Sequence, residues 1–215
     1  MSVVTIVFAK APVAGLAKTR LAPALGAEGA AALAQRLLGH ATAQAVGAAL
    51  GSVEICTTPD RAHPAFQDLA AQQGVTLTVQ GDGDLGERMH RALHRVLLHH
   101  PKALLMGADA PSLDALLLRR AAQALDQHDA VFVPALDGGY VLVGLTRAQP
   151  ALFTGMVWST AQVMANTRAR ATQAGLRWAE LPPVADIDEP ADLVHLPAGW
   201  LDRPHPTPTP HAGRP

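Results

Sequence analysis

Three positively charged side chains lie close together near the start of this sequence. Lys10, Lys18 and Arg20 fall within eleven residues, on a stretch that Pro12 and Gly15 bend. Ammonium and guanidinium groups neutralise phosphate, and arginine can bind it through two parallel hydrogen bonds. The spacing therefore predicts a phosphate site. The alternative is a solvated basic loop with no ligand.

The same stretch ends like a P-loop, because Gly15 is followed by Lys18 and Thr19. A P-loop needs glycine directly before the lysine and again five residues earlier, where its backbone approaches the phosphates. Ala17 and Pro12 occupy those two positions. A P-loop is therefore excluded.

Carboxylates occur where buried strands are expected to end. Asp109 follows an apolar run, Asp137 precedes two glycines, and Asp186 and Asp188 flank Ile187. Carboxylate oxygens suit a divalent cation, which commonly binds one or two of them together with substrate phosphates. Each acid could instead cap a helix or form a turn, since Asp-Gly is a strong hairpin signal. Downstream of Asp109, Ser112 is the expected N-cap of the next helix.

A glycine-rich acidic segment, Gly81–Met89, follows another expected strand. Its glycines would allow close approach of a ligand, and Gly86 could begin a helix with free N–H groups. Asp82 and Asp84 could equally be capping groups.

The remaining reactive side chains carry weaker signals. His90 and His94 have a spacing that can bind zinc, but no HExxH pattern accompanies them, so packing or surface roles are favoured. Cys56 has apolar neighbours and is expected to pack. Ser112 and Ser159 lack the elbow motif of serine hydrolases.

Composition limits the possible classes of protein. In 215 residues, 17 Lys and Arg face 18 Asp and Glu, so no global basic field exists to attract nucleic acid or an anionic membrane. One cysteine excludes an internal disulfide framework and favours a reducing compartment. Apolar runs are too short for a membrane span. The β-branched run Val3–Ala9 fits a buried strand better than a signal peptide, so we expect a cytoplasmic protein.

These residues must be positioned by alternating strands and helices. We expect strands at Val3–Ala9, Val53–Thr57, Val75–Gln80, Ala103–Met106, Ala130–Val133, Val141–Leu145 and Arg177–Leu181. We expect helices at Glu28–Leu50, Ala62–Gln73, Gly86–His99, Leu113–Gln127, Ala161–Ala174 and Pro190–Leu196.

This alternation indicates an α/β fold with a mostly parallel sheet covered by helices on both faces. Two strands in succession after residue 130 indicate an antiparallel insertion. One domain is expected over residues 1–196, followed by a proline-rich, mobile tail over residues 197–215. Ligands of such sheets bind at the carboxyl ends of the strands, where the charged motifs fall.

Six blocks in order resemble one family. They are KAPVAGLAKTRL, GDGDLGERM, GADAPSL, PALDGGYVLVGL, WST and DIDEPADL, from residue 10 to residue 193. The set resembles the bacterial DUF2064, or selenodomain-associated transferase 1, proteins, which have the nucleotide-diphosphosugar transferase (glycosyltransferase A) fold. In pattern the sequence is also similar to 2-phospholactate guanylyltransferase. Ala14 and Ala17 depart from the usual Pro and Val without removing a charge.

The resemblance implies roles for individual residues. The residues that it implies for nucleotide binding are Lys10, Gly15, Lys18, Thr19, Arg20, Asp84, Gly86 and Glu87. The metal, Mg²⁺ or Mn²⁺, falls to Asp109, Asp186 and Asp188. Sugar or acceptor binding falls to Asp137, Gly138, Gly139, Tyr140, Trp158, Ser159 and Thr160. The expected catalytic residues are Asp109, Asp137 and Lys18.

The expected activity is metal-dependent transfer from an activated nucleotide, with glycosyl transfer from a nucleotide sugar to a small-molecule acceptor as the first interpretation. Nucleotidyl transfer from a nucleoside triphosphate, releasing pyrophosphate, is the alternative within enzymes. A nucleotide-binding module without catalysis is the alternative outside them. The oligomeric state is left open.

Overall fold

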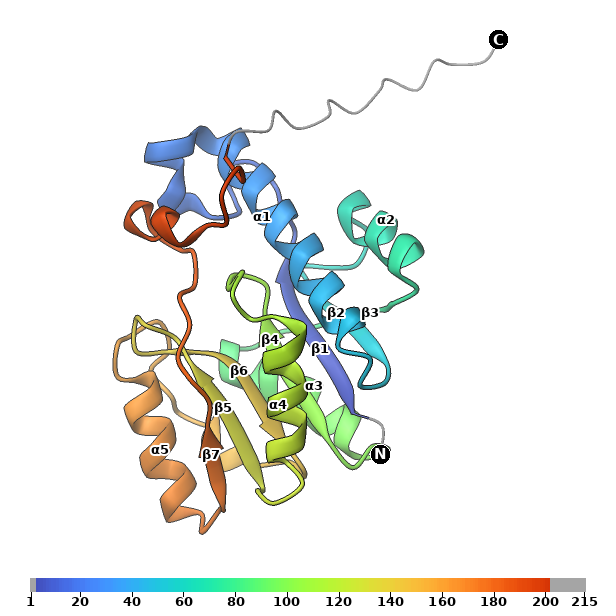
Figure 1. Ribbon diagram of the computed structural model, residues 1–215, viewed down its shortest axis with the longest axis vertical. Coiled ribbons are helices and arrows are strands. Elements are labelled where there is room, and N and C mark those ends of the chain that lie inside the picture. Colours follow the sequence, from blue (N-terminus) through green and yellow to red (C-terminus); the bar gives the residue numbers. More distant parts are fainter. Residues whose placement is uncertain (1–2, 202–215) are drawn as a thin grey trace.

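One seven-stranded sheet organises the chain in the computed structural model, which describes residues 3–201 (Figure 1). The strands are β1 (Val4–Lys10), β2 (Val53–Thr58), β3 (Thr76–Val79), β4 (Ala103–Gly107), β5 (Ala130–Pro134), β6 (Tyr140–Leu145) and β7 (Trp178–Glu180). Their order across the sheet is β3-β2-β1-β4-β6-β5-β7. The crossovers between parallel strands require the intervening helices, as the alternating pattern predicted.

The sheet is parallel except at β6. That strand runs antiparallel to both β4 and β5, whereas the other neighbouring pairs are parallel. A short loop is sufficient between β5 and β6 because antiparallel neighbours need no crossover. The expected mixed sheet with an antiparallel insertion is confirmed.

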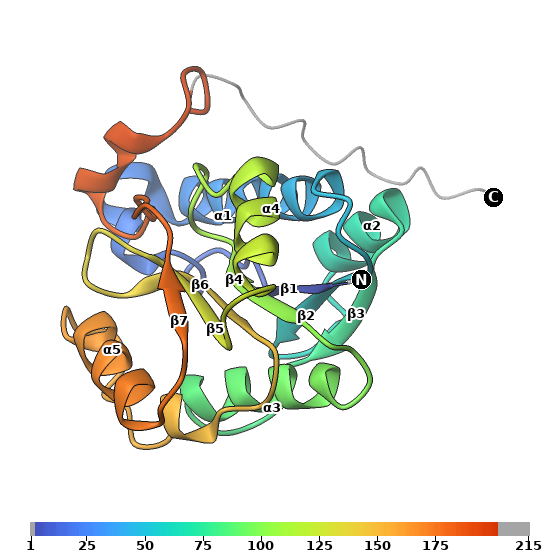
Figure 2. The ribbon, with the colours of Figure 1, turned by 60° about the horizontal axis from the view of Figure 1, so that its bottom comes forward.

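Helices cover both faces of this sheet. They are α1 (Ala22–Gly47), α2 (Pro64–Gln73), α3 (Leu85–Leu97), α4 (Ala115–Ala124) and α5 (Val163–Gln173), with 3-10 turns η1 (Thr19–Leu21), η2 (Pro150–Leu152) and η3 (Pro190–His195). Figure 2 shows α1, α2 and α4 on one face and α3 and α5 on the other. The predicted three-layer arrangement is confirmed.

Each face has its own hydrophobic core. Ile6 and Val7 are adjacent in β1 and both fully buried, yet Val7 packs with Leu38 of α1 whereas Ile6 packs with Leu93 of α3. Successive side chains of a strand point to opposite faces, so a strand covered on both sides is expected to be mostly apolar. β1 fits this expectation, with the buried Thr5 and the terminal Lys10 as its polar residues.

Two helix starts differ from the expected ones. In α1, Gly26 has φ 73° and separates a short first turn from the main helix, which leaves the long segment beginning close to the expected Glu28. In α4 the N-cap is Asp114, whose Oδ1 accepts a hydrogen bond of 2.8 Å from the Leu117 N–H, and not Ser112. Leu113 is fully buried before the first turn, so the helix begins two residues later than predicted.

The C-terminal segment crosses the sheet edge and packs beside the start of α1 (Figure 1). Ile187 is fully buried there with Leu21 and Leu37. Trp200 lies in the stretch that we expected to be a tail, but its ring contacts the Arg36 guanidinium (4.7 Å to the ring centroid) and the His40 ring (5.2 Å between centroids). The rest of the expected tail, residues 202–215, lies outside the described residues.

Within residues 3–201, no helix is both long and apolar enough to span a bilayer.

Candidate functional site

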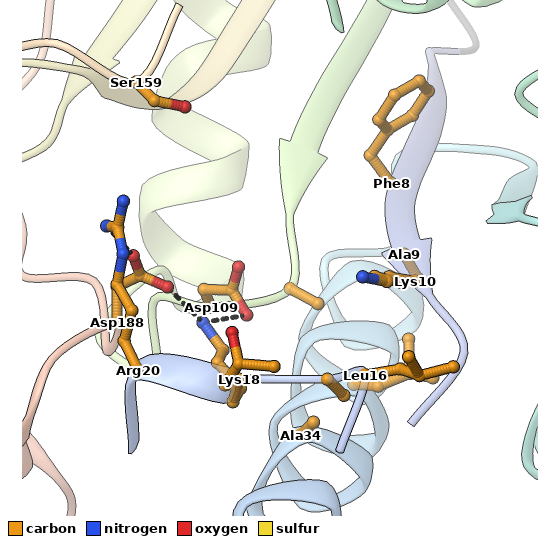
Figure 3. A pocket seen from close by; sticks show the side chains of 14 residues that line it. Phe8, Ala9, Lys10, Leu16, Lys18, Arg20, Ala34, Asp109, Ser159 and Asp188 are labelled. Carbon is orange, nitrogen blue, oxygen red and sulfur yellow. Dashed lines mark hydrogen bonds and ion pairs between the residues drawn. The ribbon is translucent and has the colours of Figure 1, made fainter. Parts of the chain in front are cut away.

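A buried lysine joins three distant segments at the carboxyl end of the sheet. Lys18 Nζ lies 2.8 Å from Asp109 Oδ1, which follows β4, and 3.6 Å from Asp188 Oδ1 of the C-terminal segment. It also donates a hydrogen bond of 2.6 Å to the carbonyl oxygen of Ile187. The lysine side chain is only 6% exposed, so its charge is directed almost entirely at these oxygens (Figure 3).

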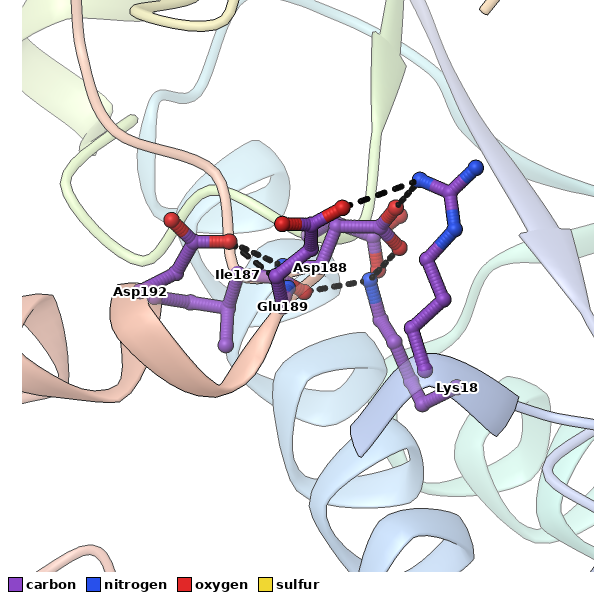
Figure 4. A network of polar contacts seen from close by, with 7 residues as sticks. Lys18, Ile187, Asp188, Glu189 and Asp192 are labelled. Atoms are coloured by element: carbon purple, nitrogen blue, oxygen red, sulfur yellow. Dashed lines mark hydrogen bonds and ion pairs between the residues drawn. The ribbon is translucent and has the colours of Figure 1, made fainter. Parts of the chain in front are cut away.

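Arg20 extends the same network towards solvent. Its Nη1 donates to Asp188 Oδ2 at 2.7 Å and lies 3.8 Å from Glu189 Oε1. Asp192 fixes the backbone of the acidic segment, because its Oδ2 accepts hydrogen bonds from the N–H groups of Asp188 (3.0 Å) and Glu189 (2.7 Å) (Figure 4). Two basic residues from the first loop therefore meet two acids from the end of the chain.

Backbone contacts fix the two acidic segments to each other. The Ile187 N–H donates to the carbonyl oxygen of Asp109 at 2.9 Å, and the Ile187 side chain is fully buried. Asp109 itself lies two residues beyond the end of β4. The carboxylates of Asp109 and Asp188 are thereby held on either side of one ammonium group.

The basic residues border a cavity of about 340 Å³, which we call the basic cavity. Lys10 lies on one side of it, at the end of β1, and Lys18 and Arg20 lie on the other (Figure 3). Its other polar lining groups are Thr19, Ser159, Asp109 and Asp188. The structure thus brings the three predicted phosphate-binding cations to one cavity, while two of them contact carboxylates in the free protein. Their role with a nucleotide stays a prediction.

A second cavity of about 530 Å³ adjoins the first and is dominated by acids, so we call it the acidic cavity. In the part of the chain that the structure describes, its lining includes one basic residue, Arg20, and five carboxylates, those of Asp109, Asp137, Asp186, Asp188 and Glu189. Leu85, Met89, Tyr140 and Trp158 add an apolar and aromatic wall. Gly139, Ser159 and Thr160, predicted to bind sugar or acceptor, also line it.

The acids influence one another across this cavity. The pKa of Asp186 is raised to about 6, first by burial and then by the negative charges of Asp137 and Asp109, while Lys18 opposes the rise. Burial also raises the pKa of the Tyr140 hydroxyl. The Tyr140 ring meets the Trp158 ring edge-on, with centroids 6.2 Å apart.

The loop between β5 and β6 holds Asp137 rigidly. Asp137 Oδ1 accepts a hydrogen bond of 2.8 Å from the Gly139 N–H, and the Gly138 carbonyl accepts one of 2.8 Å from the Met164 N–H. Gly138 has φ 93°, and a Cβ there would lie 2.3 Å from the carbonyl oxygen of Ala161. Only glycine fits at this position of the loop that carries Asp137. Gly138 is not among the residues that line the acidic cavity.

Four of the predicted nucleotide-binding residues lie outside both cavities. Asp84 and Glu87 form a reciprocal capping box at the start of α3, so Asp84 has the capping role that was its alternative, and Glu87 has one that we did not predict. Gly86 is buried where a Cβ would lie 2.9 Å from the Trp158 ring, so it positions that tryptophan. Gly15 is exposed in the first loop. Any contact of these four residues with a nucleotide stays a prediction.

The histidine pair on α3 shows no sign of a metal site. The rings of His90 and His94 lie 5.8 Å apart, and burial and the neighbouring His94 lower the pKa of His90. Within residues 3–201, no three His, Cys, Asp or Glu side chains are arranged to hold a metal ion.

The donor set around Lys18 nevertheless fits a divalent cation. Asp109 and Asp188 already hold one cationic group between them, and Asp186 lines the neighbouring wall. Mg²⁺ and Mn²⁺ take oxygen ligands, and a site with one or two carboxylates is completed by substrate phosphates and water. The protein thus offers two carboxylates, too few to bind a metal firmly without substrate.

Sequence reasoning missed part of the acidic cavity. Glu189 was visible as the last acid of the run that begins at Asp186, but the following Pro190 marked it as a helix start, and it is indeed the N-cap of η3. Leu85 and Met89 looked like ordinary core residues of α3. No local signal shows that one edge of their helix faces a cavity.

The fold, with two cavities at the carboxyl ends of its strands, places this chain in the class of nucleotide-diphospho-sugar transferase-like proteins. The chain belongs to the DUF2064 family, described as uncharacterized protein conserved in bacteria, whose sequence pattern matches residues 41–160. A protein from Desulfovibrio desulfuricans G20, described as a candidate nucleotide-diphospho-sugar transferase, is 30% identical, with a TM-score of 0.82 over 90% of this chain and 85% of that one.

More distant structures share the fold alone. Rv0371c from Mycobacterium tuberculosis H37Rv, crystallised with manganese, is 17% identical, with a TM-score of 0.56 over 91% of this chain and 97% of that one. Glucosyl-3-phosphoglycerate synthase from Mycobacterium tuberculosis, in complex with Mn²⁺, UDP and glucosyl-3-phosphoglycerate, is 8% identical, with a TM-score of 0.55 over 94% of this chain and 76% of that one. No curated protein matches the sequence.

Proposed function

We propose that this protein is a metal-dependent transferase that moves a glycosyl group from a nucleotide sugar to a small-molecule acceptor. The observation that carries the proposal is the convergence of Asp109 and Asp188 on Lys18, at the boundary shared by the basic and acidic cavities. In the proposed complex, the charged diphosphate of the nucleotide sugar lies where these groups meet, with its nucleoside on one side and its sugar on the other.

The basic cavity suits the diphosphate. Lys10 and Arg20 are exposed. The Arg20 guanidinium can replace its ion pair with Asp188 by one with a phosphate oxygen while it stays in the same place. Asp109 and Asp188, assisted by Asp186, would hold Mg²⁺ or Mn²⁺ against the same diphosphate. The cation supplies positive charge to the phosphate oxygens of the leaving group.

The transfer forms one bond and breaks one. The acceptor oxygen bonds to the anomeric carbon, the bond from that carbon to the diphosphate oxygen breaks, and the diphosphate leaves with the electron pair. Lys18 and Arg20 stabilise the negative charge that develops on it. Asp137 faces the acceptor side, and its carboxylate receives the proton that the acceptor hydroxyl loses.

Nucleotidyl transfer is the second candidate, because a cytidylyltransferase from Leptospira borgpetersenii shares the fold at 14% identity, with a TM-score of 0.56 over 90% of this chain and 84% of that one. In that reaction an acceptor phosphate attacks the α-phosphate of a nucleoside triphosphate, and pyrophosphate leaves. The released product distinguishes the two reactions.

The test begins with a thermal-shift screen of nucleoside di- and triphosphates and nucleotide sugars, each with Mg²⁺, with Mn²⁺ and with EDTA. A ligand that binds only the folded protein stabilises it by about 2.7 kcal/mol at 100 times its Kd. The best ligand is then incubated with an acceptor panel, and released nucleotide and pyrophosphate are measured by chromatography. We expect metal-dependent release of nucleoside diphosphate. Pyrophosphate release would favour the second candidate, and tight binding without turnover would favour a non-catalytic module.

A further inference from the structure

We infer that the acidic cavity selects an uncharged or positively charged sugar or acceptor group and rejects groups that carry phosphate or carboxylate. This inference rests on the proposed function, because it assigns the chemistry of the group that is held beside the diphosphate. It adds a substrate class to the reaction, with Asp137 as the residue that determines specificity.

The charges lining the cavity are strongly unequal. Five carboxylates face one guanidinium, that of Arg20, which already lies 2.7 Å from Asp188 and 3.8 Å from Glu189. Among residues 3–201, the cavity wall offers an entering acceptor phosphate or uronate carboxylate no cation that is free of a carboxylate partner. The entering group would instead lose its hydration next to like charges, which is unfavourable in a partly enclosed site.

A bound divalent cation does not reverse this imbalance. Its two charges would be offset by the diphosphate of the donor, and it would lie with Asp109 and Asp188 at the boundary between the cavities. Asp137 and Glu189 are outside that set and keep their charge in the lining of the acidic cavity. Asp137 is the better placed of the two, because the Gly139 N–H fixes one carboxylate oxygen while the other stays available to a ligand hydroxyl.

The rest of the lining suits a hydroxylated ring. Tyr140 and Trp158 offer aromatic surface, and Ser159 and Thr160 offer hydroxyls that donate or accept hydrogen bonds. A sugar presents C–H groups to such surfaces and hydroxyls to carboxylates. An amino sugar adds an ammonium group that pairs with Asp137 directly.

The experiment uses nucleotide sugars that differ only in the charge of the sugar. Isothermal titration calorimetry with Mg²⁺ gives Kd for UDP-glucose, UDP-glucuronate and UDP-glucosamine, and the guanosine pair GDP-mannose and GDP-mannuronate covers a second base. The nucleotide and diphosphate are the same within each series, so the ratio of Kd values isolates the sugar site. We expect the uronates to bind at least about tenfold more weakly than the neutral sugars, and glucosamine as tightly as glucose or more so.

Asp137→Asn is the decisive variant. Asparagine keeps the side-chain oxygen that accepts from the Gly139 N–H but removes the charge. The Kd for the uronate should therefore come within about threefold of the Kd for the neutral sugar. Asp68→Asn, on the exposed surface of α2, is the matched control and should leave the ratio unchanged.

Equal binding of uronate and neutral sugar by the wild type overturns the inference, as does a ratio that Asp137→Asn leaves unchanged. If UDP and GDP themselves bind while the sugar charge has no effect, only the inference fails. If no nucleotide binds with any metal, the proposed function fails and takes the inference with it.

Discussion

The basic and acidic cavities share Arg20, Asp109, Ser159 and Asp188, yet they differ in charge and in origin. Most of the basic cavity comes from β1, the following loop and α1. Most of the acidic cavity comes from residues 85–189, through α3, the β5–β6 loop and the C-terminal segment. One compact stretch of sequence therefore supplies the positive charge, whereas several separate stretches supply the negative charge.

Under the proposed function, this difference would orient the substrate. The two negative charges of a nucleotide sugar are on its diphosphate, which would meet the cations, and its neutral sugar would lie among the acids. The shared residues would then lie at the reacting bond. Removing charge from one cavity at a time tests whether each has the role proposed for it.

The largest effect is expected at the shared boundary. Asp109→Asn keeps the shape of the side chain but removes a charge that faces both Lys18 and the proposed cation, so turnover should fall at least roughly a hundredfold. Calorimetric titration of nucleotide with Mg²⁺ and with EDTA should show that the variant has lost the difference between the two conditions. Asp68→Asn is the control. If Mg²⁺ dependence survives in Asp109→Asn, Asp109 does not belong to the metal site.

The next effect concerns the cations. Arg20→Ala should weaken nucleotide binding by about 1.5–3 kcal/mol, because a charge-assisted hydrogen bond to phosphate is lost. Lys10 lines the basic cavity and not the acidic one, so Lys10→Ala should weaken the binding of UDP-glucose and UDP-glucuronate equally, since the diphosphate is common to both. Unchanged nucleotide affinity would return the first loop to the alternative of a solvated basic segment.

A smaller effect concerns the acidic cavity in the absence of ligand. Folding raises the pKa of Asp186 from its usual 3.8 to about 6, so between these values the folded protein binds more protons than the unfolded chain. The free energy of unfolding therefore falls as pH rises from about 4 to about 6. Asp186→Asn removes this loss, worth about 1 kcal/mol once solvent screening of a half-exposed carboxyl is included.

Thermal melts at pH 4.5 and pH 7 measure this difference. The Tm of Asp186→Asn minus the Tm of the wild type should be about 3 °C larger at pH 7 than at pH 4.5. Identical pH profiles would mean that Asp186 is not held among like charges.

The smallest effects concern the C-terminal segment that carries the acids. Trp200→Ala removes the contacts with Arg36 and His40 and should lower Tm by about 3 °C, through a loss of about 1 kcal/mol. A chain ending at Leu201 keeps Trp200 and should melt within about 1 °C of the full chain, as expected for removal of a proline-rich terminal stretch. A large drop on truncation would show that residues beyond 201 also stabilise the fold.

The strands were predictable because each has a signal in its own residues and in those next to it. β1, β2, β4 and β5 are buried on both faces and are rich in apolar residues, with Thr5 in β1 and Glu54 and Thr57 in β2 as buried polar exceptions, and turn residues separate them. The antiparallel β6 was visible because too few residues separate it from β5 for a helix. The edge strand β3 was the least clear, since its residues are partly exposed.

The motifs of the candidate site were visible for the same reason, as charged residues directly after strands. Their partners were not. That Lys18 bonds to Ile187, 169 residues away, depends on the path of the C-terminal segment across the sheet edge. Asp84 carried a ligand signal and a capping signal at once, and only the structure shows that it forms a capping box with Glu87.

The sequence by itself determined the class of fold, the strand ends that carry charge and the chemical types available there, because periodicity and residue type act over a few neighbouring positions. Only the tertiary structure decided which charges meet. Ion pairs, the raised pKa of Asp186 and the division into a basic and an acidic cavity depend on distances between segments far apart in the chain, and packing sets those distances.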